Sequence, residues 1–87
     1  MAKIIKEWSE GSVSIAVEAG KDDANRENVH VHVYKRGRRT DARISTWNSS
    51  ASGIDNEDYE IACKLFSRYL SDIKYYYEKV KNGEYDN

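Results

Sequence analysis

The sequence predicts an α+β domain: a four-stranded antiparallel β-meander with one long C-terminal helix packed on one face, in the order β-β-β-β-α. Two observations predict this fold. In the first half of the chain hydrophobic residues alternate with polar ones, which is the period of a strand with one buried face. Between residues 57 and 80 hydrophobic residues recur every three or four positions, which is the period of an amphipathic helix.

Length and composition set the limits of this prediction. The 87 residues are expected to form a single domain, 1–87, with a frayed tail at 83–87, and 39% hydrophobic residues are enough for a core. No apolar run approaches the roughly 20 residues of a membrane span, and the N-terminus lacks a hydrophobic signal core. The single cysteine, Cys63, fits a reducing compartment. We therefore expect a cytoplasmic protein with no membrane partner, no metal and no cofactor.

The first two strands are expected at residues 3–8 and 12–17. Ser9 to Gly11 supply turn residues between them, and Val13, Ile15 and Val17 share one face of the second strand. These segments predict a hairpin. Residues 19–28 are charged, contain Gly and Asn, and have no periodicity, so we expect a loop there.

A second hairpin is predicted by "NVHVHVYKRGRRTDARIS", residues 28–45. With Arg36-Gly37 as the turn, every apolar residue of one strand faces an apolar or small residue of the other, whereas a slip of one residue would break this match. The expected pairs are Val29–Ile44, Val31–Ala42 and Val33–Thr40 on the buried face, and His30–Arg43, His32–Asp41 and Tyr34–Arg39 on the open face, where Trp47 is expected too.

After a loop at 48–53, Asp55 or Asn56 is expected to cap one helix that begins near Glu57 and runs unbroken to about Lys81, before the Asn82-Gly83 stop signal. Such a helix would be about 35 to 40 Å long, more than the roughly 17 to 20 Å of a strand. Its C-terminal half is then expected to overhang the sheet or to meet a partner.

The run Tyr75-Tyr76-Tyr77 cannot turn all three rings to the core of a helix with 3.6 residues per turn. At least one ring is expected on the surface. This predicts a contact surface for a partner or for a homodimer, the alternative being that the rings simply line the edge of the buried face.

Charge is unevenly distributed, although the net charge is only −1. Residues 1–28 hold four basic and six acidic side chains, residues 29–54 hold five and one, and residues 55–87 hold five and eight. The basic turn can clamp phosphates or an acidic protein surface, or it can simply keep the hairpin tip solvated. The candidate binding residues are Tyr34, Lys35, Arg36, Arg38, Arg39 and Arg43.

Three interpretations of the two histidines remain open. A shared metal needs a further ligand, but no third His exists and Asp41 lies beside two arginines, which repel a cation. Acid–base ribonuclease chemistry would use His30 and His32 for proton transfer and Arg43 for the phosphate charge. In the simplest interpretation the histidines lie on a solvated sheet face, with His32 paired to Asp41.

The combination of "HVHV", a basic turn with glycine, "ARIS", a Ser/Gly loop and a helix ending in "IKYYYEKVKNG" resembles an uncharacterised family of small bacterial proteins, over residues 28–83. That family is known as a domain of unknown function and is often encoded near toxin–antitoxin-like genes. The resemblance implies a fold and a genomic neighbourhood but no reaction.

The sequence as a whole predicts a small non-enzymatic interaction module that binds a macromolecular partner through the basic hairpin, in a toxin–antitoxin-like setting. A protein is the favoured partner and RNA is the second. Two alternatives belong to other classes. One is a phage-encoded inhibitor of a host defence enzyme, similar in role to an anti-CRISPR protein, and the other is a small metal-independent toxin ribonuclease.

Overall fold

The computed structural model describes residues 3–19, 29–46 and 49–83. These described residues form four strands and two helices: β1 (Lys3–Glu10), β2 (Val13–Ala19), β3 (His30–Lys35), β4 (Arg38–Ser45), α2 (Asn56–Arg68) and α3 (Leu70–Lys81). The predicted α+β class and the four antiparallel strands are thus confirmed. Of the loop predicted at 19–28, Ala19 belongs to β2 and residues 20–28 lie outside the described residues, as do Trp47 and the tail beyond residue 83.

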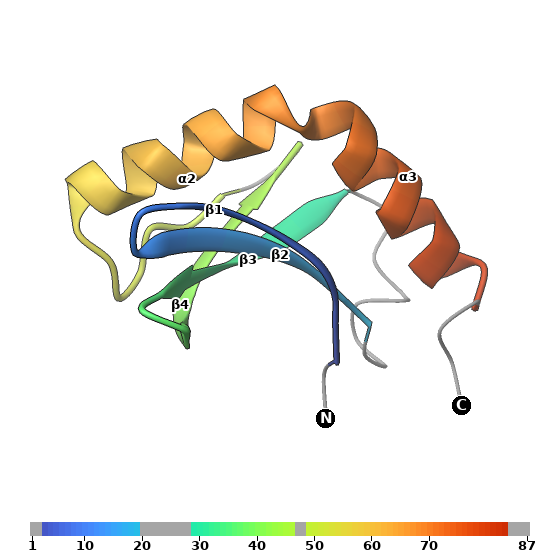
Figure 1. The fold of residues 1–87 in the computed structure, drawn as a ribbon, viewed down its shortest axis with the longest axis horizontal. Helices are drawn as coiled ribbons and strands as arrows, with labels where there is room; N and C mark the ends of the chain where they lie inside the picture. The colour runs from blue at the N-terminus through green and yellow to red at the C-terminus, as the bar shows by residue number, and fades with distance from the viewer. Residues whose placement is uncertain (1–2, 20–28, 47–48, 84–87) are drawn as a thin grey trace.

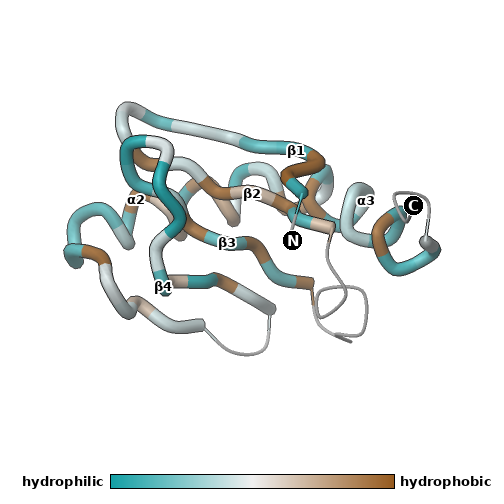
Figure 2. The backbone as a smooth tube through the Cα atoms, turned by 90° about the horizontal axis from the view of Figure 1, so that it is seen from below, coloured by the Kyte–Doolittle hydropathy of each residue, from teal (hydrophilic) through white to brown (hydrophobic). Residues whose placement is uncertain are grey.

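The strands form one open sheet in the order β1-β2-β3-β4, and each neighbouring pair is antiparallel. Both helices lie on one side of this sheet (Figure 1). Figure 2 looks at the molecule from below, so the strands stand in front of α2. This arrangement leaves the other side of the sheet for the polar residues of β2, β3 and β4.

The hydrophobic core fills the space between the sheet and the helices. Four of the five residues predicted to be buried on the second hairpin are buried, and Val29 is half-buried. Every residue of β2 is buried, so this strand is covered on both faces. The buried core consists of Val13, Ile15, Val17, Ala19, Val31, Val33, Ala42, Ile44, Ala62, Leu65, Phe66, Ile73 and Val80.

The helical segment corrects one prediction. It begins at Asn56 and ends at Lys81 as expected, but it is broken at Tyr69, whose φ and ψ of −107° and 20° lie outside the helical range. The helix therefore bends, and α3 turns down past the end of the sheet where β2 finishes and β3 begins (Figure 1). Neither helix described here is long and apolar enough to cross a membrane.

The segment contains neither Pro nor Gly near the break, so we attribute the bend to side-chain packing. Trp8 of β1 packs at the bend between α2 and α3, with its ring 6.0 Å from that of Tyr69 and 6.1 Å from that of Tyr76. Beyond the break, α3 buries Ile73, Tyr77 and Val80. The predicted overhang is therefore wrong, since this half of the helix covers the core of its own chain.

The register of the second hairpin is correct near the turn and wrong beyond it. Tyr34 pairs with Arg39 as predicted, but the register shifts before His32, which pairs with Arg43. Thr40 stabilises this bulge: its Oγ1 donates to the carbonyl of Val33 at 2.8 Å and accepts from the Ala42 amide at 3.1 Å. Because the shift is of two residues, side chains stay on their predicted faces. The predicted pairs His32–Asp41, His30–Arg43, Val31–Ala42 and Val29–Ile44 are wrong. His30 pairs with Ser45, and Val31 pairs with Ile44.

Candidate functional site

The turn between β3 and β4 is tight, and both of its central residues have positive φ, 51° for Arg36 and 77° for Gly37. This is the pattern of a type I′ turn, whose twist matches that of a two-stranded hairpin. The Arg36 amide donates to the carbonyl of Ser12 at 2.8 Å, which joins the tip to the turn between β1 and β2. The side chains of Arg36 and Arg38 are exposed. We call Lys35, Arg36, Arg38 and Arg39 the basic hairpin tip.

A depression of about 720 Å³ lies at the basic hairpin tip. All four basic residues of the tip line it, together with Thr40, Asp41 and Gly53. Two of the cations are already engaged. The Lys35 Nζ atom lies 2.9 Å from Oδ2 of Asp58, in the first turn of α2, and Arg39 reaches across the sheet toward β2. The fold thus leaves Arg36 and Arg38 as the cations of the tip without an ion pair among the described residues.

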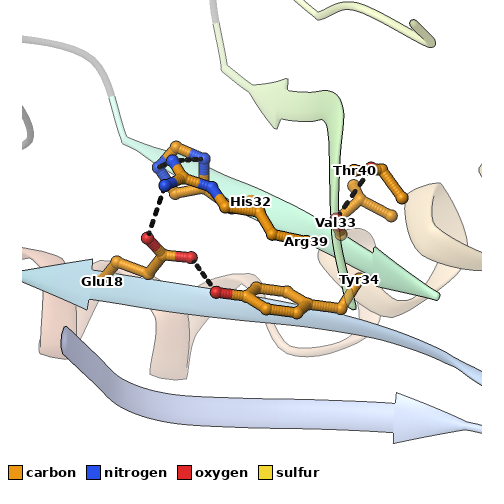
Figure 3. A network of polar contacts seen from close by, with 6 residues as sticks. All are labelled: Glu18, His32, Val33, Tyr34, Arg39 and Thr40. Atoms are coloured by element: carbon orange, nitrogen blue, oxygen red, sulfur yellow. Dashed lines mark hydrogen bonds and ion pairs between the residues drawn. The ribbon is translucent and has the colours of Figure 1, made fainter. Parts of the chain in front are cut away.

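Arg39 belongs to a polar cluster on the side of the sheet away from the helices (Figure 3). Its Nη1 lies 3.5 Å from Oε1 of Glu18, and its Nη2 lies 2.8 Å from Nδ1 and 3.2 Å from Nε2 of His32. The Tyr34 hydroxyl donates to Oε2 of Glu18 at 2.5 Å. We call Glu18, His32, Tyr34 and Arg39 the Glu18 network.

The carboxylate of Glu18 is the buried centre of this network, with 1% of its side chain exposed. Its Oε1 has no hydrogen-bond partner among the described residues. The negative charge of this oxygen is balanced by the ion pair with Arg39. A buried carboxylate destabilises a fold unless charges and donors surround it. Burial, followed by the hydrogen bond to Glu18 and its charge, raises the pKa of Tyr34 to about 12, so the phenol remains a donor at neutral pH.

Glu18 was not predicted as a site residue. The sequence carried one signal, since Ser14, Ala16 and Glu18 alternate with the valines and isoleucine of β2 and so share its other face. The pairing of β2 with β3 places Ser14 opposite Tyr34 and Ala16 opposite His32. Glu18 follows on the same face, toward His30.

His30 was predicted to lie on the open face of the sheet, but it is buried. Only 5% of this residue is accessible, and its ring packs edge-on against the rings of His32, at 5.3 Å, and Tyr77, at 5.2 Å. The cause is the bend of the helix, because α3 brings Tyr77 to the beginning of β3. Arg43, the third member of the predicted ribonuclease set, is half-buried, and its main chain pairs with Ser50 through two hydrogen bonds of 2.9 Å.

The three tyrosines of α3 separate as predicted, with at least one ring on the surface. Tyr77 is buried, Tyr76 is half-buried beside Trp8, and Tyr75 is 58% exposed. The Lys79 ammonium lies 4.9 Å from the centre of the Tyr75 ring, a cation–π contact that covers part of this aromatic surface.

Comparison of the chain with family models, with curated proteins and with solved structures finds no significant match. In the described part of the chain, no group of three or more His, Cys, Asp or Glu residues is placed to hold a metal ion.

Proposed function

We propose that this protein is a non-enzymatic interaction module whose basic hairpin tip binds an acidic surface of a protein partner. The conformation of Arg36 supports this proposal most directly. Type I′ turns favour Asn, Asp or Gly at this position, and a longer side chain in the left-handed region costs roughly 1–2 kcal/mol. Arg36 thus occupies a position where Asn, Asp or Gly would make the fold more stable, and such a strained residue is a candidate for a functional role.

The number of available cations favours a protein over RNA. Arg36 and Arg38 are exposed and have no ion pair among the described residues, whereas Asp58 and Glu18 compensate Lys35 and Arg39. Proteins that bind nucleic acid strongly commonly neutralise about 6–10 phosphates. Single-stranded RNA is also bound by exposed aromatic rings. Among the described residues, the one exposed aromatic side chain is Tyr75, on α3.

The ribonuclease alternative has less support from the geometry. A general acid or base must reach its substrate, but His30 is buried between two rings. The ring nitrogens of His32 face the guanidinium of Arg39, and the Tyr34 hydroxyl is committed to Glu18. A protein partner fits both a toxin–antitoxin-like setting and a phage-encoded inhibitor, and the neighbouring genes would distinguish these two.

The test compares three versions of the chain as bait in a lysate of the cells that carry the gene. The first is wild type, the second is Arg36→Glu/Arg38→Glu, and the third is the matched control Lys64→Glu/Arg68→Glu on the exposed side of α2. Both double variants change the net charge by the same amount. Proteins retained on the bait are identified by mass spectrometry.

We expect a partner that wild type and the α2 control retain and that the hairpin variant loses. Binding of the purified partner should also weaken as salt increases, because ions screen the arginines. Equal retention by both double variants would contradict the proposal. If nuclease treatment releases the partner, the hairpin binds RNA and the choice of a protein is wrong.

A further inference from the structure

Arg39 takes part in both the depression at the basic hairpin tip and the Glu18 network. Its side chain is 47% exposed and lines the depression at the basic hairpin tip, yet its guanidinium also contacts Glu18 and His32 in the Glu18 network. An anion bound in the depression and the Glu18 network must therefore compete for the same guanidinium.

The contact between Arg39 and His32 depends on the protonation of the imidazole. Nη2 lies 2.8 Å from Nδ1 and 3.2 Å from Nε2 of the same ring, so the guanidinium meets the imidazole across its ring and not at the lone pair of one nitrogen. Such a contact suits a neutral ring, because a guanidinium always carries a positive charge. A protonated imidazole has hydrogens on both nitrogens and a positive charge. Protonation therefore replaces this contact with a repulsion between two cations.

Glu18 offers the protonated ring another partner. Because Ala16 is opposite His32, Glu18 lies two residues further along β2 on the same face, diagonal to His32. Its buried Oε1 has no hydrogen-bond partner among the described residues and is held by Arg39 at 3.5 Å. The imidazolium can compete with Arg39 for this oxygen.

We propose that protonation of His32 releases Arg39 from the Glu18 network into the depression, so that mildly acidic pH strengthens the binding of an acidic partner. The coupling to binding rests on the proposed function, whereas the release of Arg39 does not. The titratable groups around His32 are Glu7 of β1, Glu18 of β2, His30 and Tyr34 of β3, Arg39 and Arg43 of β4, and Tyr77 of α3.

The coupling must be reciprocal. A partner that draws Arg39 away removes a positive charge from the side of His32, so binding should cause His32 to take up a proton. Histidine is the side chain that ordinarily changes its charge between pH 5 and 8.

The first experiment needs no ligand. NMR of the ¹⁵N-labelled protein follows the two imidazoles and the Arg39 Nε–Hε group from pH 8 to pH 5. We expect the Arg39 signal to shift with the same midpoint as His32. In His32→Asn, whose side chain is polar but stays neutral at every pH, the Arg39 signal should stay constant. An Arg39 signal that does not move while His32 titrates in wild type overturns the proposal.

The second experiment measures binding of an oligoaspartate peptide by calorimetry at pH 7.5 and pH 5.5. We expect about 5- to 10-fold tighter binding at pH 5.5 for wild type, near the lower limit of typical coupling. At intermediate pH, buffers of different ionisation enthalpy should reveal proton uptake. His32→Asn should show neither effect and controls for titration of the peptide. Equal pH dependence in both proteins contradicts the coupling, and absence of binding at either pH contradicts the proposed function.

Discussion

Replacing Tyr34 with Phe tests the Glu18 network directly. The change keeps the ring and removes the hydroxyl that donates to Oε2 of Glu18. Hydrogen bonds to charged groups contribute about 1.5–3 kcal/mol, and because Tyr34 is only partly buried we take the lower value. At pH 7 the variant should therefore lose about 1.5 kcal/mol of unfolding free energy.

The same hydroxyl makes this difference depend on pH. Burial and Glu18 raise the pKa of Tyr34 to about 12, from an ordinary value near 10. The folded state thus holds the phenolic proton more tightly than the unfolded state. This contribution to stability is complete below pH 10 and is lost as the pH rises from 10 to 12.

Two pKa units correspond to about 2.7 kcal/mol. Since much of Tyr34 faces solvent, screening reduces this contribution to roughly 1 kcal/mol. The advantage of wild type over Tyr34→Phe should therefore shrink from about 1.5 kcal/mol at pH 7 to about 0.5 kcal/mol near pH 12.

Urea unfolding followed by far-ultraviolet circular dichroism at a series of pH values measures this difference without interference from tyrosine fluorescence. Tyr75→Phe, at an exposed ring, is the control and should follow wild type throughout. A stability difference for Tyr34→Phe that is absent at pH 7, or that stays constant up to pH 12, would refute the reasoning.

Three further predictions concern the turn, the second helix and the binding surface. Arg36→Asn should raise the unfolding free energy by about 0.5–1 kcal/mol in urea titrations, because Asn suits the left-handed turn position, while partner binding weakens. Tyr77→Ala should cost about 3–5 kcal/mol and Tyr75→Ala less than about 0.5 kcal/mol, and equal costs would contradict the packing of α3 on the sheet. Replacing all three arginines of the basic hairpin tip with Glu should abolish partner binding. Alanine at either histidine of β3 should leave the folded protein's binding at pH 7.5 nearly intact. If the protein were a ribonuclease, the histidine variants would instead lose RNA cleavage while still binding RNA.

Local signals account for the parts of the fold that the sequence predicted correctly. Alternation identified the buried faces of β2 and β3, and Arg36-Gly37 identified the turn. Of the two predicted caps, Asp55 and Asn56, it is Asp55 that occupies the N-cap position of α2, without a side-chain hydrogen bond. At the other end of the helical segment, Gly83 has a φ of 77° and its amide bonds to the carbonyl of Val80, the usual way in which glycine ends a helix. Each of these features depends on a few neighbouring residues, so one sequence is enough to reveal it.

The break at Tyr69 and the bulge at Thr40 have no such local signal. The apolar stripe continues through Tyr69 with the same spacing, and Trp8, which packs against the rings of Tyr69 and Tyr76 at the bend, lies on a distant strand. Thr40 is an ordinary strand residue until its hydroxyl bonds to the main chain of β3 and β4. Both features stabilise the fold only after the strands and helices have met, and both move residues of the candidate site: the bend buries His30, and the bulge separates His32 from Asp41.

The charge of the candidate site follows the same rule, and this changes what the basic segment can do. By sequence, four cations of the hairpin tip are equivalent. The fold divides them, because Asp58 of α2 and Glu18 of β2 each compensate one, and neither carboxylate is near the hairpin in sequence. Composition alone therefore overstates the number of unpaired cations at the hairpin tip by about a factor of two, four against two. Two exposed arginines remain at the turn, and a third arginine, Arg39, contacts the buried carboxylate of Glu18 and the ring of His32. The positive charge that this surface can offer a partner therefore depends on the polar face of β2 as much as on the hairpin itself.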